Sequence, residues 1–457
     1  MVAIVPRAFR EEARANLKLA LPLIAAQLAA VGMGTVDTIF AGRLGGSALA
    51  AVAVGVNLNV PFFAFFMGLL MACSPIVAQA HGAGRPAAEI GAFLRLSLRF
   101  ALLGAVLWCA GLNLLAAPVL TRLSLAPETA ASAVRFAHTL SPSSFGFCLW
   151  FALRYSAEGL GRPRPILYAG LLGLAANALL DWLLLFGHFG LPRLGAPGCG
   201  VATTLSSLAM AAALAWFYRR TPGLREVRDA ASVARHAIAD GREILRVGAP
   251  TGLILLAETG LFVLAALTMA RFGETAVAAY QIAINFAALA FMIPVGISLA
   301  TTVRVGYAIG AARPRAARLR GFVGMGLGLA NAFSNAAIMA LCGGLIAAAY
   351  TRDTAVAARA AHFLWLAAAF QFFDGVQVTA NGALRGLKDT RGPSLVTLAA
   401  YWLVGWPAAW GLAFRSGLGA DGLWWGLTAG LGAAALGLSL RFHRRTRLAS
   451  LRSELMA

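Results

Sequence analysis

Long runs of apolar residues alternate with short polar segments along the whole chain. An apolar run of about 20 residues is the length that an α-helix needs to cross the hydrocarbon core of a bilayer. Read in this way, the pattern predicts twelve membrane-spanning helices. Their expected bounds are 15–40, 48–74, 90–116, 132–158, 165–187, 199–218, 242–270, 276–308, 321–349, 357–384, 393–414 and 420–441.

The composition agrees with this pattern. Hydrophobic residues make up 60% of the 457-residue chain, charged residues make up 12%, and the mean hydropathy is +0.76. A soluble globular domain usually carries about 25% charged residues, so this class is excluded. The five cysteines lack the CxxC spacing of metal sites and are interpreted as packing residues, and no removable signal peptide is expected.

A net charge of +20 is also a feature of proteins that bind nucleic acid. Most of the 38 Lys and Arg residues, however, fall in alternate polar segments between the expected spans. Cytoplasmic loops of membrane proteins collect Lys and Arg, so this distribution predicts that both termini are cytoplasmic. The orientation accounts for the positive charge, and no nucleic-acid partner is expected.

The second half of the chain repeats the first at an offset of 228 positions. This offset pairs Pro22 with Pro250, and it pairs VAQAHGAGRPAA, which starts at Val77, with VGYAIGAARPRA. Six helices per repeat is an even number, so the two halves run in the same sense about an axis along the membrane normal. We therefore predict an N-terminal lobe (1–218), a cytoplasmic linker (219–241), a C-terminal lobe (242–441) and a basic cytoplasmic tail (442–457).

Of the 18 acidic residues, thirteen lie in loops or at helix ends, and five lie within the expected spans, where ionisable side chains are rare. A carboxylate at the bilayer centre costs roughly 2.5–3.5 kcal/mol even on the mild insertion scales, so each one needs an explanation. Glu158 is expected to lie at a helix end and to pair there with Arg154 or Arg162. The remaining four acids are Asp37, Asp181, Glu258 and Asp374.

These four acids match in depth within each lobe. With a rise of about 1.5 Å per residue, Asp37 and Asp181 lie at similar distances from the outer ends of their helices. Asn177 is one turn from Asp181 on the same helix face, so the three residues could form one polar cluster. Glu258 and Asp374 each lie roughly 16–18 Å from a cytoplasmic helix end, so they could meet in the second lobe.

Two explanations of the acids are open at the level of the sequence. Each acid could be a buried structural residue held by hydrogen bonds, and Trp182 beside Asp181 is typical of an interfacial helix end. Alternatively, carboxylates without a basic partner take up a proton or a metal cation. We favour the second explanation, which is the chemistry of an ion-coupled carrier, because the acids form one depth-matched pair in each lobe.

Six motifs resemble those of the multidrug and toxic compound extrusion (MATE) transporters, in particular their NorM-type bacterial branch. The resemblance extends over essentially the full length of the chain, and the motifs are specific together although each alone is weak. They are VDTIFAGRLG (36–45), SPIVAQAHGAGR (74–85), GLGRPRP (159–165), GCGVATT (198–204), AET (257–259) and FQFFDGVQVTANGALRGLKDT (370–390).

The resemblance implies an all-helical carrier of two six-helix lobes that exports cationic, amphipathic compounds in exchange for Na⁺ or H⁺. Asp37, with Asn177 and Asp181 as partners, matches the first-lobe acid that the family links to coupling. Glu258 and Asp374 match the second-lobe acids that the family links to cation binding, and they are the candidate Na⁺ ligands. The sequence does not choose between Na⁺ and H⁺.

The resemblance also suggests residues of a substrate cavity. Thr203 and Thr204 fall where the family places partners of the first-lobe acid. Phe370 stands where some relatives have a tyrosine, so an aromatic face for cation–π contact survives and a hydroxyl ligand is lost. The full set of cavity candidates is Phe370, Thr203, Thr204, Gln281 and Asn285.

The resemblance further implies a multi-pass protein of the bacterial inner membrane. Its expected partners are cationic small molecules and membrane lipid. We expect a monomer that uses no cofactor beyond the coupling ion.

Other function classes have weaker support from the sequence. A flippase for a lipid-linked precursor, or an exporter of a specific metabolite, could use a related fold, but a flippase cavity usually has a basic floor. Intramembrane aspartyl proteases usually carry a GxGD motif, whereas here Gly375 follows Asp374. The chain has no nucleotide-binding loop, HExxH or GxSxG motif, so neither primary transport nor hydrolysis is indicated.

Overall fold

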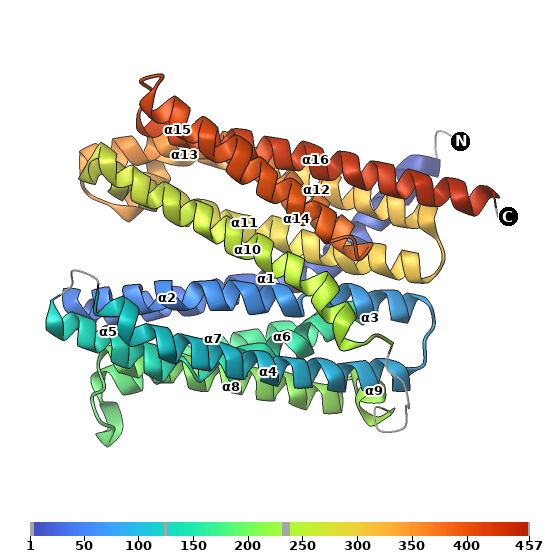
Figure 1. Cartoon of the computed structure of the whole chain (residues 1–457), viewed down its shortest axis with the longest axis horizontal. Helices are drawn as coiled ribbons and strands as arrows, with labels where there is room; N and C mark the ends of the chain where they lie inside the picture. The colour runs from blue at the N-terminus through green and yellow to red at the C-terminus, as the bar shows by residue number, and fades with distance from the viewer. Residues whose placement is uncertain (1–3, 123–125, 231–237, 456–457) are drawn as a thin grey trace. The chain divides into compact units, whose positions relative to one another are not determined.

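The chain folds into long α-helices, which Figure 1 shows in chain order. The structure is a computed structural model that describes residues 4–122, 126–230 and 238–455, and no β-strand occurs among these residues. The first helices are α1 (Ile4–Leu44), α2 (Gly46–Leu70), α3 (Cys73–Gly82), α4 (Ala87–Leu120), α5 (Pro127–Leu140), α6 (Ser143–Gly159), α7 (Pro163–Phe186), η1 (His188–Gly190), α8 (Ala196–Arg220) and α9 (Leu224–Ala230). They are followed by α10 (Gly241–Met269), η2 (Ala270–Phe272), α11 (Glu274–Gly310), α12 (Pro314–Tyr350), α13 (Thr354–Gly386), α14 (Arg391–Ala399), the π-helical turn η3 (Ala400–Gly405), α15 (Trp406–Phe414) and α16 (Ala420–Leu455).

Eleven helices in the described part of the chain are long and apolar enough to cross a membrane. The predicted all-helical, polytopic membrane fold is therefore confirmed. The twelfth expected span, 132–158, is divided between α5 and α6, which have only 14 and 17 residues. The break falls at Ser141 and Pro142, because proline lacks the N–H group that an uninterrupted helix needs.

The internal repeat is visible in the backbone at two pairs of positions. Gly45 precedes α2 with a φ of 119°, and its repeat partner Gly273 precedes α11 with a φ of 93°. Gly84 and its repeat partner Ala312 are also left-handed, with φ values of 68° and 56°. Glycine suits such positions because it has no Cβ atom. The equivalent turns therefore follow the offset that the sequence predicts.

The chain divides into two compact units, which differ from the expected lobes at α1 and α10. The N-unit comprises Ala25–Gly252, and the C-unit comprises Met1–Ile24 together with Leu253–Ala457. In this division α1 and α10 each contribute one part to each unit, and the division into lobes at the linker 219–241 stays a prediction. A hydropathy profile gives the positions of helices along the chain. It does not show that the two parts of one helix belong to different units.

Polar contacts explain why the start of α1 belongs to the C-unit. Asn16 Nδ2 donates a hydrogen bond to Thr301 Oγ1 at 3.0 Å. Glu12 forms ion pairs with Arg304 and with Arg320, the latter at 3.5 Å. These partners lie on α11 and α12, far along the chain from α1.

The expected linker and the expected tail both contain helix. In the linker, α9 buries Leu224 and Val227 beside α4 and α8, whereas residues 231–237 lie outside the described residues. The basic tail expected from residue 442 onward is instead a continuation of α16. Phe442 is fully buried there and packs edge-to-face with Phe322. Arginine content alone does not show that the residues between the arginines share one buried helix face, and the cytoplasmic position of this basic segment stays a prediction.

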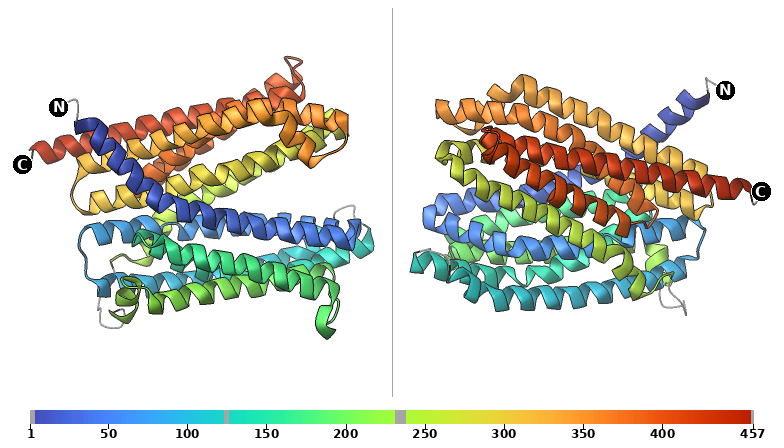
Figure 2. Two further views of the ribbon diagram at one scale, coloured as in Figure 1. Left: turned by 180° about the vertical axis from the view of Figure 1, so that it is seen from behind. Right: turned by 45° about the horizontal axis from the view of Figure 1, so that its top comes forward.

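The core of the C-unit forms around α13, which packs against α11, α12 and α16. Phe363 and Trp424 are buried in this core. Figure 2 shows α14 and α15 running beside α16 in the same unit. The N-unit has an aromatic core in which Phe63 packs edge-to-face with Trp108 and with Phe147.

Glu158 forms the helix-end ion pair that the sequence predicts. Arg154 Nε lies 2.9 Å from Glu158 Oε1, and both side chains are buried. Arg154 also donates a hydrogen bond to Gln27. A buried carboxylate that is paired in this way needs neither a proton nor a metal cation, so Glu158 is not a candidate for ion coupling.

Replacing Gly426 with Ala should destabilise the C-unit. A Cβ atom at this position would lie 2.1 Å from the backbone N and Cα atoms of Ala409 on α15, and backbone atoms cannot rotate away. Overpacking of this kind costs about 1–3 kcal/mol. We expect Gly426→Ala in detergent to unfold at a lower temperature than the wild type. Gly344→Ala is the matched control, since nothing lies within 4 Å of its Cβ position. Equal unfolding temperatures for the two variants would contradict this close approach of α15 and α16.

Candidate functional site

Three helices of the N-unit bring five side chains together around Asp37 of α1. Asn177 Nδ2 on α7 donates a hydrogen bond to Asp37 Oδ1 at 3.0 Å, and Thr203 Oγ1 on α8 donates to Asp37 Oδ2 at 3.2 Å. Asp181 lies one turn after Asn177 on α7, and Cys199 lies one turn before Thr203 on α8. We call these five residues the Asp37 cluster. The structure thus brings Asp37, Asn177 and Asp181 together, as their depths and spacing predict.

The Asp37 cluster is almost sealed and has unused hydrogen-bonding capacity. Asp181 and Asn177 are fully buried, whereas Asp37 and Thr203 each retain 8% exposure. In the described part of the chain, neither carboxylate oxygen of Asp181 has a hydrogen-bond partner, and the same holds for Asn177 Oδ1. One carboxylate oxygen from each aspartate and the sulfur of Cys199 lie within 4.8 Å of one another. Two carboxyl groups therefore face each other inside the helix bundle.

Small residues of the GCGVATT motif allow α8 to approach its neighbours closely enough to form this cluster. A Cβ atom on Gly200 would lie 2.3 Å from Thr139 Oγ1 of α5. A Cβ atom on Gly198 would lie 2.9 Å from the carbonyl oxygen of Leu184 on α7. Larger residues at either position would push α8 away from α5 and α7, and with it the side chains that contact Asp37.

The chemistry of the Asp37 cluster suits a proton better than Na⁺. Two buried carboxyl groups at this separation repel each other when both are ionised, and one shared proton removes the repulsion. A metal cation could also do so, but the donor atoms here include the sulfur of Cys199. A mixed oxygen and sulfur set fits a borderline metal such as zinc, whereas hard cations prefer oxygen ligands.

A second polar group lies in the C-unit around Glu258 of α10. Tyr401 Oη donates a hydrogen bond to Glu258 Oε1 at 2.9 Å, and Gln377 Nε2 on α13 donates to the same oxygen at 3.3 Å. Asp374 precedes Gln377 by three residues on α13 and lies within electrostatic range of Glu258. We call these four residues the Glu258 cluster. The two acids that the sequence predicts for the second lobe are therefore close enough to interact electrostatically.

The Glu258 cluster provides the oxygen atoms that a hard cation prefers, from two carboxylates, a phenol and an amide. Glu258 is half-buried, and Asp374 is 8% exposed. Arg385, in the last turn of α13, is buried, and its charge acts on Glu258. One positive charge beside two carboxylates leaves one negative charge to be balanced. A monovalent cation would balance it.

Sequence reasoning missed Tyr401. This residue lies in η3, a π-helical turn inside a segment that the hydropathy pattern presents as one continuous span. Single π-helical turns occur frequently at functional sites. Hydropathy carries no signal for such a turn, and tyrosine in a span is usually interpreted as an interfacial residue. The site therefore has a phenol hydroxyl although Phe370 lacks one.

Two of the predicted cavity residues, Phe370 and Thr204, make contacts with other parts of the protein. Phe370 is only 2% exposed, and its ring packs edge-to-face with Phe262 and with Trp424. Phe370 is therefore part of the core in this structure, and its cation–π contact with a substrate stays a prediction. Thr204 donates a hydrogen bond to the carbonyl oxygen of Thr139 on α5 at 2.9 Å. Of the two adjacent threonines, only Thr203 bonds to Asp37.

The remaining cavity candidates lie on α11. Gln281 and Asn285 are both exposed, one helical turn apart. Asn285 Oδ1 accepts a hydrogen bond from the hydroxyl of Tyr350 on α12 at 2.9 Å. These residues form a polar stripe on an otherwise apolar span, and their part in substrate contact stays a prediction.

Comparison with known families accounts for the internal repeat. A family model described as MatE matches the chain over residues 22–183 and 250–410, which together are more than half of its length. The chain belongs to the MatE family. The second matched segment begins at the residue that the internal repeat pairs with the start of the first. MatE proteins are transporters and not enzymes, which agrees with the absence of catalytic motifs in the sequence.

Full-length bacterial relatives support the assignment to the MatE family. "Multidrug resistance protein PmpM" from Pseudomonas aeruginosa is 38% identical over 455 residues, which cover 96% of this chain and 92% of the relative. "Probable multidrug resistance protein NorM" from Xanthomonas campestris pv. campestris is 38% identical over 443 residues, which cover 96% and 95%. The resemblance to the NorM-type branch is thereby confirmed, and this MatE chain is a multi-pass membrane protein.

A solved structure shows the same fold. The eukaryotic MATE transporter AtDTX14 superposes with a TM-score of 0.84, covering 97% of this chain and 99% of that one. The sequence identity between them is 22%. The likeness establishes the MATE fold for this chain, and the roles of individual residues rest on its own geometry.

Proposed function

We propose that this MatE protein exports cationic, amphipathic drugs across the bacterial inner membrane in exchange for H⁺ or Na⁺, by alternating access. Support comes from full-length relatives that are named multidrug resistance proteins. It also comes from the acidic character of both clusters, because buried negative charge attracts organic cations as well as coupling ions. A flippase for an anionic lipid precursor would instead need basic side chains at these positions.

The close approach of Asp37 and Asp181, whose carboxylate oxygens lie within 4.8 Å of each other, is the observation that carries this proposal. Both acids lie in helices that are long and apolar enough to span a membrane. A purely structural acid is expected to have its oxygens satisfied by donors, as those of Asp37 are by Asn177 and Thr203. Asp181 has no such donor among the residues that the structure describes, so the structural explanation does not account for it.

We assign the coupling proton to the Asp37 cluster. When the pair holds one proton, the protonated carboxyl group can donate to the other carboxylate, and the charge of the pair is minus one. Loss of the proton leaves two negative charges within 4.8 Å of each other in a buried site, which favours a conformation that separates or hydrates them. A conformation-dependent affinity for the proton is what couples its entry to export.

We assign Na⁺, as a second coupling ion, to the Glu258 cluster. Its carboxylate, phenol and amide oxygens match the preference of hard cations, and one negative charge remains after Arg385 is counted. An entering positive charge gains about 2.3 kcal/mol per 100 mV of inside-negative potential. Exchange of one such ion for one monovalent drug is electrically neutral, so the ion gradient alone drives it.

We further propose that both termini face the cytoplasm and that the protein acts as a monomer. The orientation rests on the concentration of Lys and Arg in alternate polar segments. We propose a monomer because each cluster lies within a single unit and is assembled from side chains of one chain.

Drug accumulation in living cells tests the proposed function. Cells that lack their own drug exporters should hold less ethidium when they produce this chain than when they carry an empty vector. Each 1.4 kcal/mol of ion gradient supports about a tenfold difference in ethidium concentration. Collapse of the ion gradients should raise ethidium to the level of the control cells. Equal ethidium in both cell types, with the chain present in the membrane, would contradict the proposal.

Replacing Tyr401 with Phe should weaken Na⁺ binding and leave the fold intact. The change removes the hydroxyl group at Glu258, which should cost about 1–2 kcal/mol and raise the half-saturating Na⁺ concentration about 5–30-fold. Tryptophan fluorescence of the purified protein can follow the titration. Tyr280→Phe is the matched control, because the Tyr280 hydroxyl is buried in the same unit without a hydrogen-bond partner among the described residues. Equal Na⁺ affinities for the two variants would show that the Tyr401 hydroxyl does not contribute to Na⁺ binding.

A further inference from the structure

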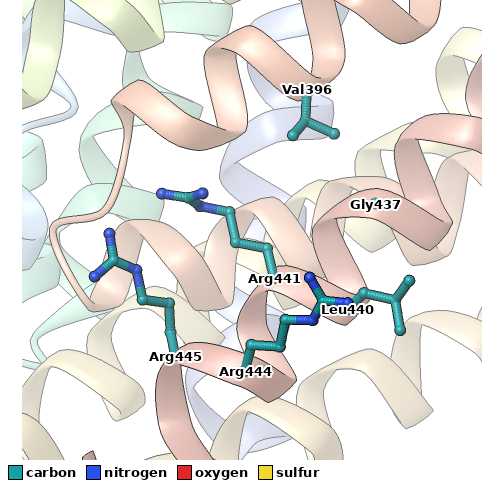
Figure 3. A pocket seen from close by; sticks show the side chains of 6 residues that line it. All are labelled: Val396, Gly437, Leu440, Arg441, Arg444 and Arg445. Carbon is teal, nitrogen blue, oxygen red and sulfur yellow. The ribbon is translucent and has the colours of Figure 1, made fainter. Parts of the chain in front are cut away.

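A basic pocket in the C-unit lies outside both acid clusters, between α14 and α16 (Figure 3). Its volume is about 470 Å³. The lining residues from α16 are three or four positions apart, so they share one helix face. The wall of the pocket combines apolar side chains with three arginines. The lining residues are Val396, Gly437, Leu440, Arg441, Arg444 and Arg445.

A single carboxylate holds two of the three arginines in place. Arg441 donates to both oxygens of Asp389, at 2.9 and 3.0 Å, and Arg445 Nε lies 3.3 Å from Asp389 Oδ2. Figure 3 shows the guanidinium groups of Arg441 and Arg445 extended to the same side of α16, with that of Arg444 nearer to Leu440. Arg444 is exposed and forms no ion pair within the described residues. Two of the three positive charges are therefore not compensated.

The pocket lies at the level where two membrane spans end. One span begins at Arg391, next to Asp389, and another ends at Arg447, so the two spans share this end of the bundle. Large apolar side chains next to the pocket point outward, with 69% exposure for Leu395 and 48% for Leu440. Outward apolar side chains followed by a cluster of arginines match the polarity of a phospholipid, from acyl chain to headgroup.

We propose that this pocket binds one anionic phospholipid, whose phosphate contacts Arg444 and Arg445 and whose acyl chain lies along Val396 and Leu440. Gly437 forms the floor of the groove, because a Cβ atom there would lie 2.7 Å from Val396 Cγ1. Asp389 fixes Arg445 in advance, which lowers the conformational cost of binding. The site requires only that this end of the bundle lies at a membrane surface, so it does not depend on the proposed drug export.

Arginines at a helix end are common in membrane proteins. This pocket differs from an ordinary helix end because its arginines lie beside a groove and two of them are held in place by a carboxylate. The last turn of α8 offers a comparison, since it carries Arg219 and Arg220. Arg220 there stacks over the ring of Trp216 instead of pairing with a carboxylate beside a groove. The pair Arg219 and Arg220 carries the same charge as the pair Arg444 and Arg445. Replacing each pair in turn therefore distinguishes general attraction to a membrane from binding in the pocket.

Native mass spectrometry of the purified full chain tests the proposal by counting retained lipids. The chain is incubated with phosphatidylglycerol or with phosphatidylcholine of the same acyl chains. The wild type should retain one more molecule of phosphatidylglycerol than of phosphatidylcholine. The double variant Arg444→Gln, Arg445→Gln should need about 30-fold more phosphatidylglycerol for the same occupancy. The double variant Arg219→Gln, Arg220→Gln should bind like the wild type.

A single variant keeps the test decisive if the double variant fails to fold. Arg444→Gln leaves the ion pairs of Asp389 intact and should still weaken phosphatidylglycerol binding about fivefold. Equal retention of both lipids by the wild type would overturn the proposal, as would equal losses in the α14–α16 pocket variant and the α8 variant. Displacement of phosphatidylglycerol by inorganic phosphate alone would also overturn it, because the site would then recognise a free anion.

Discussion

Asp37→Asn should abolish proton-driven drug transport while the protein remains in the membrane. Asparagine keeps the shape of aspartate and can still accept a hydrogen bond from Thr203, but it cannot take up the proton that the pair with Asp181 shares. In vesicles with a pH difference of about one unit, one-for-one exchange supports about a tenfold concentration ratio of drug. The variant should stay at a ratio near one, which ethidium fluorescence in the vesicles would measure.

Asp353→Asn is the matched control for Asp37→Asn. Asp353 caps α13 by accepting hydrogen bonds from the backbone N–H groups of Ala355 and Val356. Asparagine caps helices about as well as aspartate, so this variant should transport like the wild type. An Asp37→Asn protein that still concentrates ethidium under a pH difference would show that the coupling proton binds elsewhere.

Glu258→Gln should strongly weaken Na⁺-driven exchange. In the wild type, the carboxylates of Glu258 and Asp374 together with the guanidinium of Arg385, which acts on Glu258, leave one negative charge to attract a cation. In the variant, one carboxylate and one guanidinium remain, so the net charge of these groups is zero. Coupling between two bound ligands is typically worth about 1–3 kcal/mol, so the acceleration of ethidium efflux by Na⁺ should fall roughly 5- to 150-fold.

Proton-driven transport serves as the internal control for Glu258→Gln, because it should survive this change if the two clusters act separately. Glu274→Gln removes an exposed carboxylate from the first turn of α11 and should affect neither ion. Loss of both proton-driven and Na⁺-driven transport in a folded Glu258→Gln protein would contradict the assignment of one ion to each cluster.

The spans and the repeat can be predicted from the sequence because both are local in character. A run of apolar residues determines a span wherever it occurs, and the offset that pairs Pro22 with Pro250 needs no structure to be seen. The packing of α1 in two units cannot be predicted in this way, since it depends on distant partners such as Thr301 for Asn16. The buried end of α16 escapes prediction for the same reason, because Phe442 is buried by contact with Phe322, which is far away in the sequence.

The candidate sites show the same division between local and distant information. Helical spacing fixes the shared face of Asn177 and Asp181, and the depth match correctly places Asp37 beside them. Cys199 is interpreted from the sequence as a packing residue, since a lone cysteine gives no sign of the carboxylates near it. Tyr401 is missed because its position depends on a π-helical turn.

Ethidium transport by the purified protein in lipid vesicles tests cation-coupled drug export most directly. Ethidium is followed under a proton gradient, under a Na⁺ gradient and with no gradient. We predict that either gradient drives ethidium against its own concentration in the wild type, that Asp37→Asn loses only the proton-driven part, and that Glu258→Gln loses only the Na⁺-driven part. An ethidium distribution that is the same with and without the gradients would contradict cation-coupled export by this chain.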